Sequence, residues 1–364
     1  MTTDVQSATF SELTTLGVGG PADRLVETTT EAELIDVVRT ADAEGVPLLV
    51  LGGGSNLLVS DAGFDGLVVR DVRRDLTTPD HSACAGVTVT AAAGTPWDDV
   101  VAHAASHRLK GIEALSGIPG STGATPVQNV GAYGQEVAQT IATVRVWDRQ
   151  KNRVRTLPVV DLQFGYRTSL LKRSMRALPD AADPGAPWYP TPRYVVLDVT
   201  FQLRVADLSE PIRYAELARA LGIAVGERAP LPEVRATVLA LRARKGMVLD
   251  PTDPDTRSAG SFFTNPVLTE ADAAALPEDA PRFPAGEGLV KTSAAWLIEQ
   301  SGFAKGYGLP GPAALSTKHT LALTNRGGAN AGDLLALART VRDGVAHRFG
   351  ITLEPEPVLV NADL

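Results

Sequence analysis

The sequence predicts an α+β protein that contains α/β-type units and folds into more than one domain. A chain of 364 residues, 44% hydrophobic and 21% charged, can bury a large core, which excludes a disordered chain or a coiled coil as the main architecture. The 34 glycines and 25 prolines are spread along the chain rather than gathered in a low-complexity tract. Strand and helix patterns also alternate from Arg24 onwards. Together these observations favour a globular protein with many tight turns.

The first predicted α/β unit lies between Arg24 and Arg70. The apolar strand RLVETT precedes the helix AELIDVVRTADAEG, for which Thr30 and Glu33 form a capping box and Gly45 supplies the C-terminal end. The buried strand VPLLVL follows and turns sharply at LGGGSNLL, after which LLV has the pattern of a strand.

A second α/β segment begins at the strand GVTVTAAA. Thr95 is the expected cap and Pro96 the first residue of a helix through WDDVVAHAASHRL. Residues 111–134 then lose all periodicity, and a loop of that length in a compact domain suggests a functional role. Strands return at TIATVRVWD, NRVRTL and YVVLDVTFQLR, and a proline-rich stretch over 172–193 reads as a surface excursion.

From Leu231 the pattern predicts a second domain of sheet packed with helices. The predicted order is helix LPEVRATVLALRARK, strand SFFTNPVL, helix TSAAWLIEQSG, strand HTLALTN and the long helix DLLALARTVRDGVAHRFG, capped by Asn330. The final ITLEPEPVLV is strand-like and could return to either domain.

Composition also limits the partners and the compartment. A net charge of −8 with scattered lysines and arginines gives no bulk attraction for nucleic acid. No apolar run approaches the roughly 20 residues that span a bilayer, so we expect no membrane span. The single cysteine, Cys84, cannot form an internal disulfide, and the first residues lack an export signal, which indicates the cytoplasm. The absence of a long exposed apolar stripe favours a monomer.

His103 and His107 are the only candidates for a metal site that spacing suggests. Histidines four apart on a helix can share one metal ion. No third ligand is evident nearby, so we expect ordinary histidines and no metal.

Two glycine-rich segments could hold an anion. In GGGSN, residues without Cβ let backbone N–H groups approach a phosphate, and Ser55 and Asn56 add side-chain donors. The segment differs from both G-x-G-x-x-G and the Walker loop, and an ordinary glycine turn remains the alternative. In GIPGSTGATPVQNVGAYG, glycines alternate with small polar residues, which suits a flat or charged ligand, and a long adaptable loop is the alternative. Together the two segments suit a ligand with a pyrophosphate and a ring system.

GSFFTNP contains a candidate proton donor. Ser261 stands between glycine and two phenylalanines, and a desolvated hydroxyl can deliver a proton to carbon if a neighbour holds it. The available partners are Arg167 in GYRTSLLK and the pair Glu354 and Glu356 in LEPEPVLV, since a carboxylate in an apolar segment is costly unless it is paired or used. Without such a partner, Ser261 is an ordinary strand serine.

These segments occur in an order that resembles a known family. TLGVGGPAD, LGGGSNLL, GIPGSTGATPVQNVGAYG, GYRTSLLK, GSFFTNP, AAWLIEQSGFAKG and LEPEPVLV, from about Leu16 to Val360, resemble the UDP-N-acetylenolpyruvoylglucosamine reductases, flavoenzymes of peptidoglycan precursor synthesis. The resemblance implies an FAD-binding region of the vanillyl-alcohol-oxidase (PCMH) type in two subdomains, residues 1–74 (completed by 350–364) and 75–206. It also implies a C-terminal substrate-binding α+β domain over 230–349.

The resemblance also implies a reaction. NADPH reduces non-covalently bound FAD, and hydride then passes to C3 of the enolpyruvyl group of a UDP-sugar, which yields UDP-N-acetylmuramate. Ser261 is implied to protonate C2, while Arg167 and Glu356 polarise the substrate carboxylate. The implied FAD-binding residues are Gly52, Gly53, Gly54, Ser55, Asn56, Leu57, Gly117, Ile118, Pro119, Gly120, Gly123, Ala124, Val127, Gln128 and Gly131. The implied substrate-binding residues are Tyr133, Arg167, Tyr214, Lys245, Asn265 and Gln300.

The sequence also departs from the family pattern and leaves alternatives open. PIRYAEL around Tyr214 indicates the subgroup with a mobile tyrosine-bearing loop, but Thr168 stands where that subgroup has Asp, Pro357 follows Glu356, and the excursion over 172–193 is long. One alternative is an oxidase that tethers FAD through histidine, although GGGSN contains none. Another is a flavin or nucleotide-sugar binder without turnover, which would not need Ser261. A plain NAD dehydrogenase is disfavoured because G-x-G-x-x-G is missing.

Overall fold

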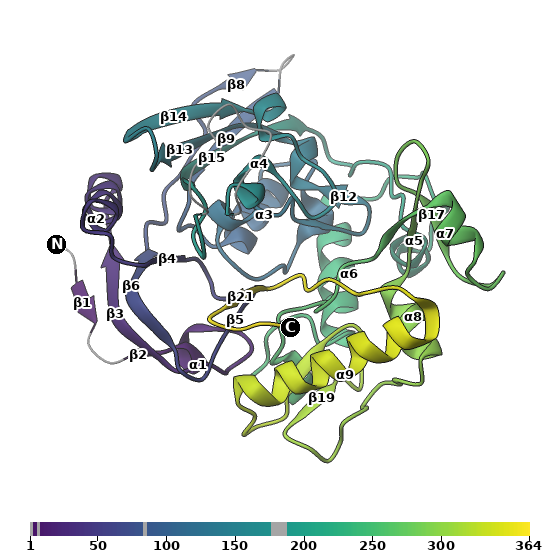
Figure 1. Ribbon diagram of the computed structural model, residues 1–364. Coiled ribbons are helices and arrows are strands. Elements are labelled where there is room, and N and C mark those ends of the chain that lie inside the picture. Colours follow the sequence, from purple (N-terminus) through teal and green to yellow (C-terminus); the bar gives the residue numbers. More distant parts are fainter. Residues whose placement is uncertain (1–2, 6–7, 83–85, 176–187) are drawn as a thin grey trace. The chain divides into compact units, whose positions relative to one another are not determined.

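The chain forms two compact units, each built from several segments. A computed structural model describes residues 3–5, 8–82, 86–175 and 188–364 (Figure 1). Unit 1 comprises Met1–Ala8, Ala22–Gly54 and Asp65–Arg244, and unit 2 comprises Thr9–Pro21, Ser55–Phe64 and Lys245–Leu364. Both units mix helices with strands. The three-part division implied by the resemblance has other boundaries and stays a proposal.

The first sheet of unit 1 carries the predicted strand–helix–strand pattern. Its strands run in the order β1 (Thr3–Val5), β3 (Pro21–Thr28), β6 (Phe64–Asp71) and β4 (Leu48–Leu51), with β4 parallel to β6. Helix α2 (Glu31–Glu44) packs Leu34 and Val38 into the same apolar cluster as the strands. The capping box of Thr30 and Glu33 and the left-handed Gly45, with φ of 67°, confirm the predicted helix ends.

The second sheet of unit 1 is antiparallel. Its main path is β14 (Arg153–Pro158), β13 (Ile141–Asp148), β15 (Tyr194–Val205), β9 (Gly86–Ala92) and β7 (Leu76–Thr77). Along β9, the buried Val87, Val89 and Ala91 alternate with less buried threonines, which is the period-2 pattern of a strand. Helix α3 (Trp97–Ser106) buries Trp97 and Val101 in the same core.

The predicted cap of α3 is wrong. Pro96 occupies the N-cap position and the helix begins at Trp97. The Thr95 hydroxyl instead donates to the carbonyl of Asp75 at 3.0 Å. The Trp97 N–H donates to the carbonyl of Gly120 at 3.0 Å, so a distant loop satisfies the group that a cap would have taken.

Helices α5 (Ala215–Leu221) and α6 (Leu231–Arg244) complete unit 1. Their apolar residues Leu217 and Val238 form one cluster with Ile212 and with Ala114 of the short 3₁₀ helix η1 (Glu113–Leu115). The loop predicted over 111–134 is therefore packed against helices rather than free in solvent.

Unit 2 is organised around α9 (Ala331–Phe349), which packs against α8 (Ala294–Gln300) (Figure 1). The strands form three small sheets: β16 (Val267–Thr269), β18 (Leu289–Thr292) and β17 (Arg282–Pro284); β19 (Ala313–Leu315) with β20 (Leu323–Asn325); and β21 (Val358–Val360) parallel to β5 (Leu57–Val59). Asn330 accepts from the Asp333 N–H, which confirms the predicted cap of α9. The predicted strand after GGGSN is also confirmed, as β5.

Three strands predicted in unit 2 are shorter than expected. SFFTNPVL is extended as a strand only over β16, HTLALTN only over β20, and ITLEPEPVLV only over β21. Pro266, Pro355 and Pro357 carry no N–H and so cannot donate to a ladder, which explains the first and last of these corrections.

The remaining short elements are β2 (Ala8–Thr9), α1 (Phe10–Leu13), β8 (His81–Ser82), β10 (Leu109–Lys110), η2 (Thr122–Ala124), β11 (Gly131–Ala132), β12 (Gln135–Glu136), η3 (Val137–Gln139), η4 (Val159–Leu162), α4 (Leu170–Arg173), η5 (Pro254–Thr256) and α7 (Glu270–Ala274). Within the described ranges, no helix combines the length and apolarity needed to cross a bilayer. Cys84 and residues 176–187 of the predicted excursion lie outside the described residues.

Candidate functional site

The two glycine-rich segments predicted to hold one ligand meet in unit 1. A Cβ added to Gly52 would stand 2.5 Å from Ser121 Oγ, and one added to Gly53 would stand 2.7 Å from Gly120 Cα. The Ser121 hydroxyl could rotate away from a side chain at position 52, but the backbone of Gly120 could not move so easily. The close approach of the two backbones therefore requires glycine at position 53. The structure therefore brings the turn after β4 against the loop over 117–131.

That loop is also fixed to the second sheet by its own backbone. The Thr122 N–H donates to Thr95 at 2.8 Å and the Gly123 N–H to Ala93 at 2.9 Å. A Cβ on Gly123 would stand 2.5 Å from the Ala93 Cβ. This part of the loop thus consists of backbone and small side chains, the kind of groups that can hold the pyrophosphate of FAD.

Charged side chains that the sequence interpretation missed hold the start of this loop. Asp98 of α3 accepts the Gly117 N–H at 2.6 Å and forms two 2.7 Å hydrogen bonds with Arg235 of α6. Arg242 of α6 is buried and donates its Nε–H to the Gly117 carbonyl at 3.1 Å. The signal available in sequence was an acidic residue in the first turn of one helix and arginines on another, which is too common to single out.

Burial and hydrogen bonding shift the pKa values of Asp98 and Arg242. Burial acts to raise the pKa of Asp98, but hydrogen bonds from Arg235 and from the Gly117 N–H outweigh it and leave the pKa below its ordinary value. Burial lowers the pKa of Arg242. Asp98 and Arg242, here called the Gly117 clamp, thus bind the backbone N–H and the backbone carbonyl of Gly117.

Arg167 lies in unit 1 beside the end of the same loop. Its Nη2 donates to the Gly131 carbonyl at 3.0 Å and its Nη1 to the Asn129 carbonyl at 3.4 Å. Its φ of 52° is left-handed, a conformation that costs a side-chain residue roughly 1–3 kcal/mol and is often found at functional sites. Thr168, the departure from the family pattern, closes this turn through its backbone, because its N–H donates to Gly165 at 3.3 Å.

The substrate candidates Tyr133 and Tyr214 also meet in unit 1. Their rings pack edge to face, with centroids 5.5 Å apart and planes at 88°. Tyr133 has a left-handed φ of 49°, and burial raises the pKa of its hydroxyl to about 12. Tyr214, at the N-terminus of α5, is 45% exposed.

Ser261 and Glu356 meet in unit 2 through backbone hydrogen bonds between their segments. The Glu356 N–H donates to the Phe262 carbonyl at 2.8 Å, and the Thr264 N–H donates to the Glu354 carbonyl at 3.0 Å. Phe262 and Phe263 are each 1% exposed and pack edge to face, whereas Ser261 is half-buried. The structure thus brings the segment of Ser261 against the segment of Glu354 and Glu356 through their backbones, and the pairing of the Ser261 hydroxyl with a carboxylate stays a prediction.

The last residue of the first glycine segment joins this pair. The Asn56 side chain donates its Nδ2–H to the Glu356 carbonyl at 3.4 Å. The backbone carbonyl of Asn56 accepts the Val358 N–H at 3.0 Å. Of the other substrate candidates in unit 2, Asn265 accepts the Ala294 N–H at 2.9 Å, Lys245 is half-buried just after α6, and Gln300 is exposed at the end of α8.

His103 of α3 and His107, the residue that caps its C-terminus, stack on each other. The rings of His103 and His107 stack with centroids 4.0 Å apart, and burial followed by the charge of His107 lowers the pKa of His103. In the described ranges, no group of three or more His, Cys, Asp or Glu residues could hold a metal ion.

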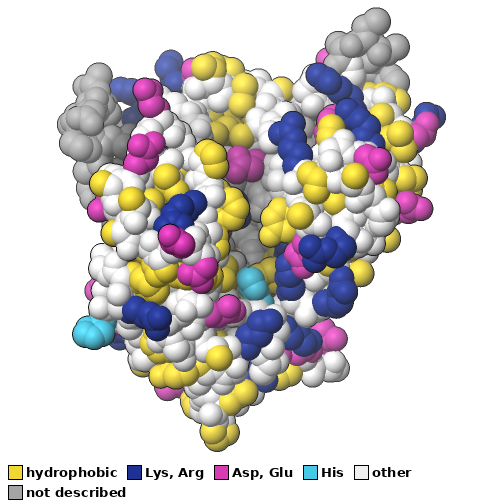
Figure 2. All heavy atoms as spheres, turned by 90° about the vertical axis from the view of Figure 1, so that its right-hand side faces the viewer, with side chains coloured by type: hydrophobic (Ala, Val, Ile, Leu, Met, Phe, Trp, Pro, Cys, Tyr) yellow, Lys and Arg dark blue, Asp and Glu magenta, His cyan; other side chains and the backbone are white. Residues whose placement is uncertain are grey.

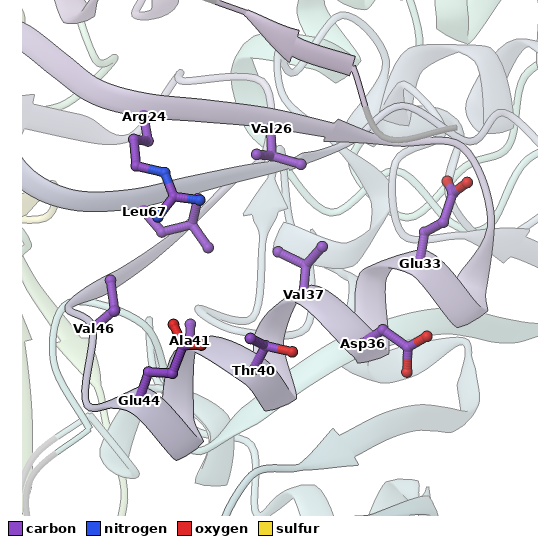
Figure 3. A pocket seen from close by; sticks show the side chains of 10 residues that line it. All are labelled: Arg24, Val26, Glu33, Asp36, Val37, Thr40, Ala41, Glu44, Val46 and Leu67. Carbon is purple, nitrogen blue, oxygen red and sulfur yellow. The ribbon is translucent and has the colours of Figure 1, made fainter.

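One groove of about 480 Å³ lies elsewhere on unit 1, between α2 and strands β3 and β6 (Figure 3). It is lined by apolar side chains such as Val26 and Leu67 and by acidic ones such as Asp36 and Glu44, and none of the predicted site residues lines it. On the face drawn in Figure 2, basic and acidic side chains are interspersed, without a continuous basic field.

Comparisons with known proteins identify the family of this chain. Residues 22–157 match the FAD binding domain family, and residues 250–360 match the C-terminal domain family of UDP-N-acetylenolpyruvoylglucosamine reductase. The reductase of that name from Thermobifida fusca is 52% identical over 100% of both chains. The one from Cutibacterium acnes is 54% identical over 98% of this chain and 90% of its own.

A solved structure confirms the α+β fold of the FAD-binding type. The crystal structure of UDP-N-acetylenolpyruvylglucosamine reductase from Thermus caldophilus has a TM-score of 0.63 and 26% identity, and the match covers 99% of this chain and 100% of that one. With relatives more than half identical over nearly their full length, this chain belongs to the UDP-N-acetylenolpyruvoylglucosamine reductase family.

Proposed function

We propose that this enzyme reduces UDP-N-acetyl-3-O-(1-carboxyvinyl)-glucosamine to UDP-N-acetylmuramate in the cytoplasm, with FAD as cofactor and NADPH as hydride donor. This would be the reductive step of peptidoglycan precursor synthesis. The observation that carries the proposal is the hydrogen bond from the Glu356 N–H to the carbonyl of Phe262, the residue after Ser261, in a chain 52% identical to a reductase of this family.

The glycine segments are proposed to hold FAD without a covalent bond. Gly53 leaves room only for the backbone of Gly120, and the Ser121 hydroxyl lies beside Gly52. When bound, the flavin supplies the hydride for the substrate and accepts it from NADPH. No histidine lies in GGGSN, so no tether can form there.

The chain's own residues supply the proton and the fixed charges. Ser261 is proposed to deliver a proton to C2 of the enolpyruvyl group, a role that suits a hydroxyl flanked by buried phenylalanines. Arg167 is proposed to bind the substrate carboxylate, for which its planar guanidinium provides two parallel donors. Glu356 is proposed to steady the developing negative charge by donating a hydrogen bond from its carboxylic acid form, since an ionised carboxylate would repel that charge. Fixed donors of this kind stabilise a transition state without reorganising.

The remaining candidates are proposed to bind the nucleotide-sugar. Tyr133, Tyr214, Lys245, Asn265 and Gln300 offer aromatic, cationic and amide groups for the uridine, the diphosphate and the sugar. Because Tyr214 is 45% exposed at a helix start, it can close over substrate after binding.

Ser261→Ala tests the chemical assignment. We expect the variant to keep FAD and to be reduced by NADPH at the normal rate, while its reaction with the enolpyruvyl substrate slows by about three orders of magnitude, the size of a lost general acid. Stopped-flow absorbance separates the two half-reactions. Thr340→Ala, which removes an exposed hydroxyl of α9, is the control and should match the wild type. Normal substrate reduction by Ser261→Ala would remove Ser261 from the mechanism.

A visible spectrum and acid precipitation test the cofactor assignment. The purified protein should show flavin absorption, and acid should release all of it into the supernatant. Flavin retained on the precipitate would indicate a covalent oxidase instead, and a colourless protein that binds no added FAD would contradict the proposal.

A further inference from the structure

Glu113 is a carboxylate buried at the start of the second glycine-rich region. It opens the 3₁₀ helix η1 and is only 1% exposed. Burying a carboxylate costs free energy unless its oxygens accept hydrogen bonds. The reaction proposed above does not use this carboxylate, so its burial must serve another purpose.

Each carboxylate oxygen of Glu113 accepts a backbone N–H from a different segment. Oε2 accepts from Gly111 at 2.6 Å, and Oε1 accepts from Glu210 at 2.7 Å. Gly111 begins the loop that continues into the proposed FAD-binding residues. Glu210 lies in the segment that leads to Tyr214. One side chain therefore joins the loop over 111–131, here called the cofactor loop, to the segment 209–214, here called the substrate loop.

On the cofactor side, the chain from Glu113 to Gly117 is held at successive residues. The Ser116 hydroxyl donates to the Glu113 carbonyl at 2.7 Å, and the Trp97 indole donates to the Leu115 carbonyl at 3.1 Å. Gly117 is then clamped by Asp98 and Arg242. A displacement of Glu113 would therefore reach the start of the FAD-binding loop.

On the substrate side, the segment before Tyr214 is equally well held. The Ser209 N–H donates to Ala229 at 2.9 Å, and the Ile212 N–H donates to Glu227 at 2.8 Å. Ile212 is 3% exposed and belongs to the same apolar cluster as Ala114, the neighbour of Glu113. The hydrogen bond to Glu210 and this apolar contact thus act on the same pair of segments.

We propose that Glu113 is a positioning residue that couples FAD binding to the placement of the Tyr214 segment, so that the substrate loop is correctly set only when the cofactor loop is. The inference rests on the proposed function, because it takes residues 117–131 as the FAD loop and Tyr214 as a substrate residue.

Glu113→Gln tests this coupling in the holoenzyme. Glutamine keeps the shape and one acceptor oxygen but turns an amide donor toward one of the two N–H groups. We expect both the Kd for FAD and the KM for the UDP-sugar to rise roughly tenfold, the effect of losing one hydrogen bond to a charged group. The kcat at saturating FAD and substrate should change less than KM, since no reacting atom is touched. A lower Tm with unchanged Kd and KM would show a merely structural role and overturn the inference.

Two further variants make the result specific. Glu227→Gln removes an exposed carboxylate that accepts the Ala224 N–H at 2.8 Å in the same part of unit 1, and it should leave Kd and KM unchanged. Tyr214→Phe should raise the KM for the UDP-sugar without changing FAD binding, and the double variant with Glu113→Gln should be less than additive in KM. If Tyr214→Phe leaves KM unchanged, the proposed role of Tyr214 fails. If Tyr214→Phe raises KM but Glu113→Gln does not, the coupling alone fails.

Hydrogen exchange of the wild-type protein covers the case in which Glu113→Gln does not fold. Removal of FAD should increase exchange of backbone amides over residues 209–214 as well as over 111–123. Unchanged protection of 209–214 on removal of FAD would overturn the coupling.

Discussion

The two parts of the proposed site are held in place by different means. In unit 1, charged side chains bond to the backbone of the glycine loop, as Asp98 and Arg242 do at Gly117. In unit 2, backbone bonds join the segment of Ser261 and the buried Phe262 and Phe263 to the segment of Glu356. We therefore expect single side-chain substitutions to displace the cofactor loop and to weaken FAD binding. Substitution of polar side chains near Ser261 should leave its position unchanged, because backbone hydrogen bonds hold its segment.

The largest effect on the cofactor loop is expected from Gly53→Ala. The new Cβ would stand 2.7 Å from Gly120 Cα, so the two glycine segments must separate. Overpacking of this kind costs about 1–3 kcal/mol, which corresponds to roughly 5- to 150-fold weaker FAD binding if the whole cost falls on the bound state. Fluorescence titration of the apoprotein with FAD measures it.

Gly45→Ala is the matched control for Gly53→Ala. Gly45 ends α2 with a left-handed φ of 67°, and nothing lies within 4 Å of the added Cβ. It should lower stability by about 1 kcal/mol without changing the Kd for FAD. Equal Kd values for Gly53→Ala and the wild type would show that the contact of the two loops does not shape the cofactor site.

Asp98→Asn should give the next largest effect. Asparagine can still accept the Gly117 N–H, but it loses the charge that pairs with Arg235. We expect FAD binding to weaken by a factor of roughly 3–10, the range for a hydrogen bond of a partly exposed charged pair. Asp99→Asn, an exposed neighbour in the same helix turn, should bind FAD like the wild type. Equal binding by both variants would argue against the clamp.

The contribution of Asp98 should also depend on pH. Its pKa is below the ordinary value in the folded protein, so the stabilisation is fully present above the pKa of an unfolded aspartate, about 3.9, and is lost as the pH falls through the lower folded value. The difference in unfolding free energy between wild type and Asp98→Asn should thus shrink below about pH 4. Urea titrations at pH 7 and at lower pH measure this difference, and a gap that widens with acid would contradict the assignment.

The same contrast explains what the sequence could predict. Periodic apolar residues and caps such as Thr30 and Asn330 act locally, so helices α2 and α9 and strands β9, β13 and β15 lie where they were predicted. Thr95 was misjudged because the group that satisfies the start of α3 is a carbonyl of Gly120, distant in sequence. Glu113 was missed for the same reason, since one of its two partners is the N–H of Glu210. Pairings over such distances leave no local pattern.

The smallest effect is expected in unit 2, from Asn330→Ala. The Asn330 side chain accepts the Asp333 N–H at 2.8 Å, and loss of such a cap usually costs about 0.5–2 kcal/mol. Here the Asp61 carboxylate also accepts the N–H groups of Ala331 and Gly332, at 2.8 and 3.0 Å. Because most of the free N–H groups of α9 keep a partner, we expect a loss of unfolding free energy near the low end of that range, with unchanged FAD binding and turnover. Asp61→Asn combined with Asn330→Ala should cost more than the sum of the single variants. Strictly additive free energies from urea unfolding would show that the two caps act independently.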